Sequence, residues 1–315
     1  MKVGIGSVCQ AGKQTTWGTS VAPTVKINMT SESIATTAEK GDEGNLIAKK
    51  TRDQADLIAI NTEGGVSAIL RPEFADWLFE CALGKASSGV YTLQDVNVDL
   101  PISTLVMSRG GIVKTYPDMT IRSLTITAPA QDYVRVDIDF IGTKEISAGG
   151  TGAQTVQNIS FTLPSYKCTK ATLKYGAGGT ASSSLTTELC VNEATITIDN
   201  GAEEPSATYC DGLYNGRPIP GLRTVTADIT LPFSDTVESF RQAYLLNESA
   251  PTVALLLQFT TSDEDETVDV YLPNVAITTA DGNVDGQGVI SSSISGEALS
   301  VGSTEPITIT VTHNE

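Results

Sequence analysis

The sequence has little of what an enzyme active site needs. Among its 315 residues there is a single histidine, His313, close to the C-terminal end. Acid–base and nucleophilic catalysis use histidine more often than any other side chain and need it held in a defined geometry. Nothing in the sequence places two carboxylates together in a pocket either. We therefore expect a protein that is not an enzyme and that needs no cofactor or metal ion.

Long apolar runs and paired cysteines are also missing. No run approaches the ~20 apolar residues that cross a bilayer, so we expect no membrane contact. The N-terminal residues lack the apolar core of a secretory signal. The five cysteines form no C-x-x-C pair, and reduced thiols in a cytosolic folding compartment are the expectation. Aromatic residues make up only 6% of the chain; of the two tryptophans, Trp77 is expected in the core and Trp17 as an anchor.

Two short motifs resemble ligand sites without meeting their requirements. Gly6–Thr15 has glycines and a lysine like those of a phosphate loop, but the spacing is one residue off and Gln14 replaces the hydroxyl that would hold magnesium. The acidic run Asp263–Glu266 lacks the glycine and the spaced ligands of a calcium loop. A solvated hairpin tip is therefore favoured there over a loosely bound calcium ion.

Basic residues are outnumbered by acidic ones, 20 to 37, which gives a formal net charge of −17. Such a charge argues against a protein that wraps nucleic acid through phosphate contacts. It does not exclude nucleic acid that passes by without binding. What the chain does contain in quantity is Thr, Ser, Val, Ile and Gly, and this composition with its many turn residues predicts a mainly-β protein.

Two stretches, one in each half of the chain, carry the same order of features. A strand at 66–70 leads into a helix predicted over Pro72–Leu83, and a strand at 224–231 leads into a helix predicted over Pro232–Leu245. Each helix has a proline in its first turn, where the missing N–H costs nothing. The offset of roughly 150–160 residues matches one domain, so the pattern indicates one domain written twice.

This repeat predicts the organisation of the chain. We expect an extended N-terminal arm over residues 1–24, a first domain over 25–146, a Gly/Ser/Thr-rich linker over 147–166 and a second domain over 167–315. Two polar segments, Ser31–Asn61 and Asn200–Arg223, are too polar for core and too long for simple turns, so they are expected to project from the domains.

The order and spacing of several segments resemble those of the phage tail tube (major tail) protein family. The segments that carry the resemblance are Gln14–Ile27, Gly64–Leu70, Phe74–Gly84, Ile112–Thr127 and Val134–Gly142, with weaker echoes in the second half. The resemblance implies two tandem tail-tube-like β-sandwich or barrel domains, each with one short flanking α-helix. It also implies a structural virion protein that assembles with itself into stacked rings, forming the hollow tail tube through which DNA is delivered.

Further expectations follow from the resemblance. A duplicated chain can close a pseudo-sixfold ring with three copies. The partners are then further copies of the chain, the tail terminator, tape measure and baseplate proteins, and DNA passing through the lumen without specific binding. The protein is expected in the virion tail, after assembly in the host cytoplasm.

Strand alternation suggests which residues line the lumen. In Tyr133–Phe140 apolar and polar residues alternate, so one face of this strand is wet. The lumen candidates on such wet faces are Arg135, Asp137, Asp139, Asp199 and Asp228, with Arg135 neutralised by Asp137 and Asp139. The alternative is that these residues face solvent outside the tube. Candidates for contacts between rings are the charged residues of the projecting segments, Glu39, Lys40, Asp42, Glu43, Lys49, Lys50, Arg52, Arg217 and Arg223.

Two other functions stay open at this point. A baseplate hub or decoration protein of a virion has the same character and is distinguished by whether the purified protein polymerises into tubes. An acidic adhesion or carbohydrate-binding β-protein is a weaker alternative, because such proteins more often carry a signal peptide and exposed aromatic platforms.

Overall fold

The fold of the chain is mainly β, as predicted. The computed structural model describes residues 4, 6–41, 56–95, 98–203, 212–214, 216–247, 252–283 and 291–313. All pairings between the strands of these residues are antiparallel, and only two α-helices occur among them. Neither helix of the described residues is long and apolar enough to cross a membrane.

The elements alternate between long strands and short connecting pieces. The helices are α1 (Pro72–Leu83), α2 (Asp235–Tyr244) and the 3-10 turn η1 (Ser182–Ser184). The strands of the first half are β1 (Val8–Gln14), β2 (Val25–Ile27), β3 (Met29–Glu32), β4 (Ala35–Gly41), β5 (Asp56–Ile69), β6 (Gly84–Ser87), β7 (Val90–Leu93), β8 (Ile102–Arg109), β9 (Ile112–Pro129), β10 (Arg135–Gly142) and β11 (Ile146–Ser147). Those of the second half are β12 (Lys167–Ala177), β13 (Thr187–Leu189), β14 (Glu193–Asp199), β15 (Thr224–Pro232), β16 (Val253–Thr260), β17 (Glu266–Asn283), β18 (Ser291–Ala298) and β19 (Thr308–His313).

The two halves use the same order of strand pairings. In the first half β1 pairs with β2 and β8, β8 with β9, β9 with β10, and β10 with β5. Strand β5 also pairs with β3 and β4. In the second half β12 pairs with β13 and β16, β16 with β17, β17 with β18, and β18 with β15, which also holds β14. A helix follows β5 and β15 alike. This repeat is consistent with the predicted duplication; the domain boundaries stay a prediction.

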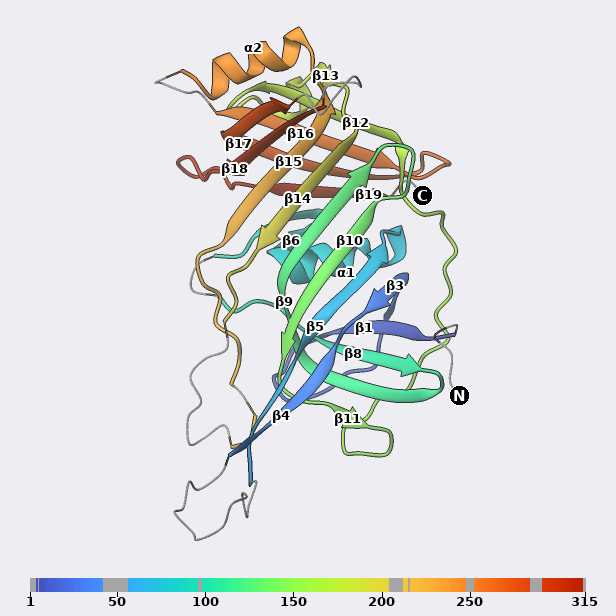
Figure 1. Cartoon of the computed structure of the whole chain (residues 1–315). Coiled ribbons are helices and arrows are strands. Elements are labelled where there is room, and N and C mark those ends of the chain that lie inside the picture. The colour runs from blue at the N-terminus through green and yellow to red at the C-terminus, as the bar shows by residue number, and fades with distance from the viewer. Residues whose placement is uncertain are drawn as a thin grey trace.

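One sheet runs through both halves. Strand β14 pairs with β9 over seven residues, with Ile196 opposite Ile126. The strand order β5–β10–β9–β14–β15–β18–β17, which we call the shared sheet, is therefore continuous across the middle of the molecule (Figure 1). Strands β9 and β17 are long enough to pair in the shared sheet with one end and with β8 or β16 with the other.

Helix α1 has the bounds that the sequence predicts. Pro72 stands in its first turn, and Gly84 ends it at a φ of 94°, with its N–H donating to Glu80 O. Its side chains Phe74 and Leu78 are fully buried against the sheet, which is worth about 1.5–3 kcal/mol each. In Figure 1 the helix lies behind β9 and β10, where it fills the core of the first half.

The prediction for the second helix is wrong at its start. Pro232 is the last residue of β15, and the helix begins only at Asp235. The reason is Ser234, whose Oγ accepts a hydrogen bond from the N–H of Val237 at 3.4 Å and so caps the helix. A serine cap three residues before a buried valine was the better start signal, and Pro232 is tolerated at the end of a strand.

The expectation of an arm outside the core is wrong for residues 8–14. They form β1, which pairs with β2 on one side and β8 on the other, and most of its residues are buried. The repeat of pairings explains why: β1 is the counterpart of β12, the opening strand of the second half. Its polar residues are satisfied inside, since Gln14 bonds Thr104 Oγ1 at 2.9 Å and the N–H of Asp118 at 2.8 Å.

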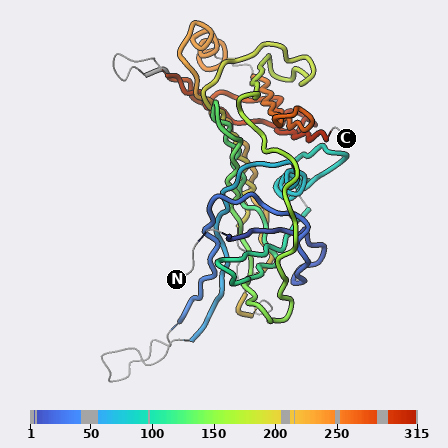
Figure 2. The backbone as a smooth tube through the Cα atoms, turned by 90° about the vertical axis from the view of Figure 1, so that its right-hand side faces the viewer, coloured from blue at the N-terminus to red at the C-terminus, as the bar shows by residue number. Residues whose placement is uncertain are grey.

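The first projecting segment contains a β-hairpin formed by β4 and the start of β5. Strand β4 pairs with the start of β5, and the two extend away from the body of the molecule (Figure 2). The strand predicted at 66–70 is the last part of a longer strand, β5. Gly64 lets it bend without breaking: its φ is 137°, and a Cβ there would lie 2.5 Å from Ser33 O.

The predicted linker lies along the first half. Gln157 and Gln10 exchange two hydrogen bonds of 2.7 Å between side chain and backbone. Further along, the carboxylate of Glu73 accepts from the N–H groups of Thr162 and Leu163 at 2.6 and 2.7 Å. Hydrogen bonds thus hold residues 154–166, which we call the strap, against the first half of the chain, including the first turn of α1.

Candidate functional site

The shared sheet has one polar face, and the five predicted lumen residues all lie on it. Pairing places Arg135 opposite Thr127, Thr127 opposite Thr195, and Thr195 opposite Asp228, so these four form one row across both halves. Asp139, Ser123 and Asp199 form a second row in the same way. Side chains of directly opposite residues point to the same side of a sheet. Residues far apart in the sequence therefore share one surface, which we call the polar face.

The opposite face of the shared sheet is apolar and buried from solvent. Its rows contain Ile138, Leu124 and Ile198, each with at most 1% of its surface exposed. This contrast fixes the register, because a shift by one residue would bury the aspartates and expose the core. The polar face follows from the core that lies behind it.

Threonine and serine occupy most of the polar face between the acids. The hydroxyls of Thr125 and Thr197 lie 3.2 Å apart where the two halves meet. Asp137 accepts a hydrogen bond from Ser67 on the neighbouring strand, and Asp228 accepts one from Ser295. These two pairs bridge β5 to β10 and β15 to β18, which are equivalent strand pairs in the two halves.

Both arginines of the polar face are already paired with acids. Nη2 of Arg135 lies 2.6 Å from Oδ2 of Asp132. The hydrogen bond from the backbone N–H of Tyr133 and, after it, this contact with Arg135 lower the pKa of Asp132. The expectation that Asp137 and Asp139 neutralise Arg135 is therefore wrong. Asp137 and Asp139 stand two and four residues from Arg135, roughly 7 and 13 Å along the strand. Asp132 stands in the turn before β10 and reaches the guanidinium directly.

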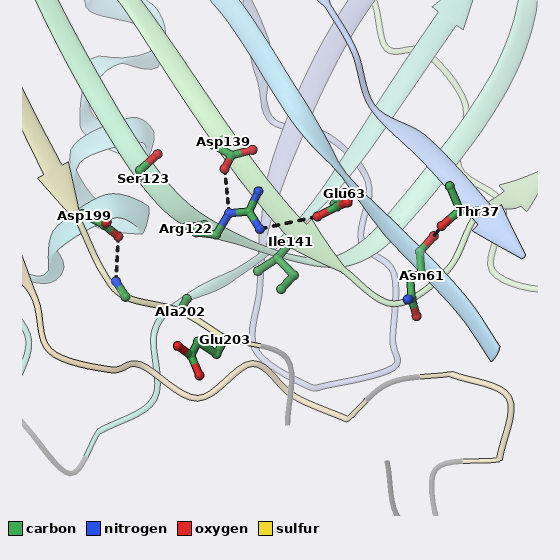
Figure 3. Close-up of a pocket in the computed structure, with 11 residues that line it drawn as sticks. Thr37, Asn61, Glu63, Arg122, Ser123, Asp139, Ile141, Asp199, Ala202 and Glu203 are labelled. Carbon is green, nitrogen blue, oxygen red and sulfur yellow. Dashed lines mark hydrogen bonds and ion pairs between the residues drawn. The ribbon is translucent and has the colours of Figure 1, made fainter. Parts of the chain in front are cut away.

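Arg122 is the second arginine, and sequence reasoning missed it. Its Nε lies 2.6 Å from Asp139 Oδ2 and its Nη1 lies 3.4 Å from Glu63 Oε2, and the hydrogen bond to Asp139 is the main cause that raises the pKa of the guanidinium (Figure 3). A register shift of the pairing between Asp139 and Phe140 brings Arg122 to this face. No sequence signal marks that bulge, so periodicity alone could not have found the residue.

The network of Arg122 lies in an open hollow of about 590 Å³ at the end of the polar face. Four carboxylates line it, those of Glu63, Asp139, Asp199 and Glu203, with Arg122 among them (Figure 3). Asp199 accepts from the N–H of Gly201 at 2.8 Å, which ties the acid to the segment after β14. Four acids against one base keep the hollow negative.

The candidates for contacts between rings fall into three groups. Asp42, Glu43, Lys49, Lys50 and Arg52 lie outside the described residues. Glu39 and Lys40 lie exposed on β4, in the projecting hairpin. Arg217 and Arg223 make contacts within the chain: Arg217 pairs with Asp99 at 2.7 Å and donates to Leu100 O, and Arg223 donates to Gln94 O at 3.1 Å.

Trp17, the predicted anchor, is half-buried and lies under the guanidinium of Arg217 at 5.9 Å from the ring centroid. This contact joins the loop after β1 to the segment between β14 and β15. Asp263, Glu264 and Asp265 form the exposed tip between the paired strands β16 and β17, as favoured from the sequence, whereas Glu266 is the first residue of β17 and is buried. The described cysteines are free thiols, and burial raises the pKa of Cys9 and Cys81 to about 12, which makes both unreactive.

The described chain has two halves with the same order of strand pairings, one sheet that continues through both, and a polar face of acids and hydroxyls. Comparison with known families identifies the class of protein to which this chain belongs. The family model described as phage tail tube protein matches residues 4–298, nearly the whole chain. The chain therefore belongs to the phage tail tube protein family and is a structural protein of the virion tail. No curated protein matched the sequence.

Proposed function

We propose that copies of this chain close into rings, that the rings stack into a hollow tube, and that DNA passes through its lumen. The observation that carries the proposal is the polar face of the shared sheet. It runs without interruption through both halves of the chain, and a continuous polar surface of this kind is what each subunit would contribute to the wall of a channel.

The chemistry of the polar face suits a channel that does not hold DNA. DNA carries one negative charge per ~1.7 Å of its axis, and a basic wall would bind it through released counterions. Among the described residues, Asp137 and Asp228 are exposed and hydrogen-bonded to serine hydroxyls alone, whereas Arg122 and Arg135 are paired with acids. The remaining surface is hydroxyl-rich, so a passing duplex meets weak repulsion and few specific donors.

Three chains per ring is the stoichiometry that we favour. Each chain repeats one set of strand pairings twice, so three chains supply six equivalent segments. Such a ring needs heterologous contacts that close on themselves. The tail terminator, tape measure and baseplate proteins are the partners proposed for the ends and the interior of the tube.

Stacking of the rings is assigned to the hairpin of β4 and β5. It projects from the body (Figure 2), and its described end carries Glu39 and Lys40. Exposed ion pairs contribute only about 0.2–1 kcal/mol each, so stacking depends on many repeats of the contact. Arg217 and Arg223 serve instead to hold the second segment against the first half.

Cryo-electron microscopy of assembled particles tests the proposal. The expected result is a stack of rings, each built from three chains, with Asp137 and Asp228 on the inner wall. Six chains at one radius would overturn the three-chain ring. A polar face that points outward would overturn the channel assignment, and particles that cap or decorate another tube would favour the hub or decoration alternative.

A further inference from the structure

The two halves of the chain are joined by the pairing of β9 with β14, which we call the internal joint. Strand β9 is the edge strand that the first half contributes to the shared sheet, and β14 is the edge strand from the second half. The two pair antiparallel, with Leu124 opposite Ile198. The N–H of Asn200 donates to Arg122 O at 2.9 Å, which continues the ladder beyond the strand end. The joint thus consists of backbone hydrogen bonds with apolar side chains behind them.

The same two strand positions occur a second time, and there no described strand pairs with their outer edges. Strand β17 corresponds to β9, yet from Ala276 onward it pairs only with β18 among the described strands, because β16 starts at Val253, opposite Val275. Strand β4 corresponds to β14, yet the only strand of the described residues that pairs with it is β5. Each position leaves one outer edge without a strand partner.

The counterpart of Leu124 is Ala280. Both pairs of outer strands keep an unbroken register at this point: Ile138 of β10 lies opposite Leu124, and Ile294 of β18 lies opposite Ala280. Ile138 and Ile294 are themselves equivalent, since each lies opposite a buried residue, Val66 or Ile229, of the strand before the helix. Ala280 is also as buried as Leu124, with 1% of its surface exposed.

The counterpart of Ile198 is Thr36. Ile198 lies opposite Val225, four residues before Ile229, and Thr36 lies opposite Thr62, four residues before the equivalent Val66. No bulge interrupts either stretch. The two free edges therefore match the two strands of the internal joint residue by residue.

We propose that the outer edge of β17 in one copy of this chain pairs antiparallel with the outer edge of β4 in the next copy, with Ala280 opposite Thr36 and Thr279 opposite Thr37. The inference rests on the proposed self-assembly and names the strands and the register through which it occurs. The partner is a second copy of the chain, because the joint that it repeats is one the chain already makes with itself.

Chemistry at the edges supports this register and sets its length. An unpaired edge of seven residues without proline invites another strand. Thr37 and Thr279 are both exposed and fall on the polar face, where the internal joint carries the hydroxyl pair Thr125–Thr197. At Ile34 the edge is closed, since its N–H donates to Glu32 and its carbonyl accepts from Arg109 at 2.7 Å. Pairing is thus confined to the stretch from Ala35 onward.

A disulfide between copies tests the register. In the internal joint the N–H of Asn200 donates to Arg122 O, so Ile198–Leu124, two residues along, is a hydrogen-bonded pair, and Thr36–Ala280 corresponds to it. Hydrogen-bonded and non-hydrogen-bonded pairs alternate, so the next pair, Thr37–Thr279, is a non-hydrogen-bonded one. Its Cα atoms are ~4.5 Å apart, within the range that a disulfide spans. The variant is T37C/T279C in a background with Cys190→Ser and Cys210→Ser. The matched control is A35C/T279C, in which the diagonal Cβ atoms stand ~7 Å apart and cannot be bridged.

Mild oxidation of assembled protein should convert most T37C/T279C chains into covalent multimers on a denaturing gel, and leave A35C/T279C unlinked. Assembled T37C/T279C protein whose thiols stay free would overturn the joint. The size of the largest multimer separates this inference from the proposed ring. A ladder that ends at three chains supports both, whereas one that ends at another number keeps the joint and refutes the three-chain ring.

A second variant tests the joint without cysteines. Thr36→Pro removes the N–H that the proposed ladder uses, at an edge position where proline is compatible with the folded strand. Thr36→Val is its matched control, because it removes the same hydroxyl and keeps the N–H. T36P is expected to remain folded by circular dichroism and to lose assembly in sedimentation, while T36V assembles. Folded T36P that assembles like the wild type would contradict the proposal.

Discussion

Nε2 of His313 lies 2.9 Å from Oδ2 of Asp76, so the last strand, β19, is tied to the first helix, α1. The other ring nitrogen of His313 contacts the carboxylate of Glu266, which is almost fully buried. Strand β19 also pairs with β7, which follows α1 in the chain. The only histidine of the sequence therefore fastens the second half of the chain onto the first.

This contact predicts a pH-dependent contribution to stability. Burial lowers the pKa of His313, but the hydrogen bonds and charges of Asp76 and Glu266 outweigh it and raise the pKa above its ordinary value. A histidine with a raised folded pKa stabilises fully below its unfolded pKa of about 6.5 and loses that contribution as the pH rises through the folded pKa. Urea unfolding at pH 5.5 and pH 9 should show H313Q less stable than wild type at the lower pH and closer to it at the higher. An equal loss at both pH values would contradict the assignment.

The second prediction concerns Gln14, on a strand that the sequence suggested was a loose arm. Its amide bonds Thr104, Asp118 and Thr19 O, and it is 3% exposed. Gln14→Ala leaves buried partners unsatisfied and should lower the free energy of unfolding by about 1–3 kcal/mol. Lys13→Ala is the control on the same strand. Its exposed pair with Glu80 should cost under about 1 kcal/mol, and an equal loss for both variants would place residues 8–14 outside the core after all.

The third prediction concerns the strap formed by the linker. Glu73→Gln weakens the two bonds from Thr162 and Leu163, because a neutral amide accepts less strongly than a carboxylate. Faster hydrogen exchange at these two amides, by about tenfold or more, and faster proteolysis within residues 154–166 are expected. Glu80→Gln on the same helix is the control and should leave exchange in the strap unchanged. Unchanged exchange in E73Q would mean that other contacts hold the strap.

The fourth prediction concerns the proposed lumen. Asp137→Lys with Asp228→Lys places bases on the polar face at positions where the acids bond serine hydroxyls alone among the described residues, so folding and assembly should survive. Asp139 is left in place because it holds Arg122. DNA ejection from particles that carry the double variant is expected to slow, most at low salt where phosphate contacts are strongest. Matched particles with Asp137→Asn and Asp228→Asn separate added positive charge from lost negative charge, and unchanged ejection in the lysine variant would refute the channel assignment.

Composition and periodicity determined the class of the fold and much of its core. The alternation around Val136 and Ile138 predicted a strand with one wet face, and the structure has it as β10. Helix α1 was predicted to the residue, because Pro72 and the glycine at 84 mark both ends in the sequence itself. These features depend on neighbours within a few residues, which is the range over which sequence patterns carry information.

Tertiary structure decided what joins the halves. Gln14 looks like a polar residue of an arm until Asp118 is placed beside it, more than a hundred residues away. Arg122 reaches Asp139 only because a bulge shifts the pairing of β9 and β10, and no local pattern reports a bulge.

The sequence by itself determined that aspartates lie on the wet faces of strands; it did not determine that these faces are one surface. Asp139 and Asp199 fall into one row because β9 pairs with β14, and that pairing depends on the complete register of both halves. A strand needs a partner for its backbone groups, and which partner it finds is set by packing across the whole chain.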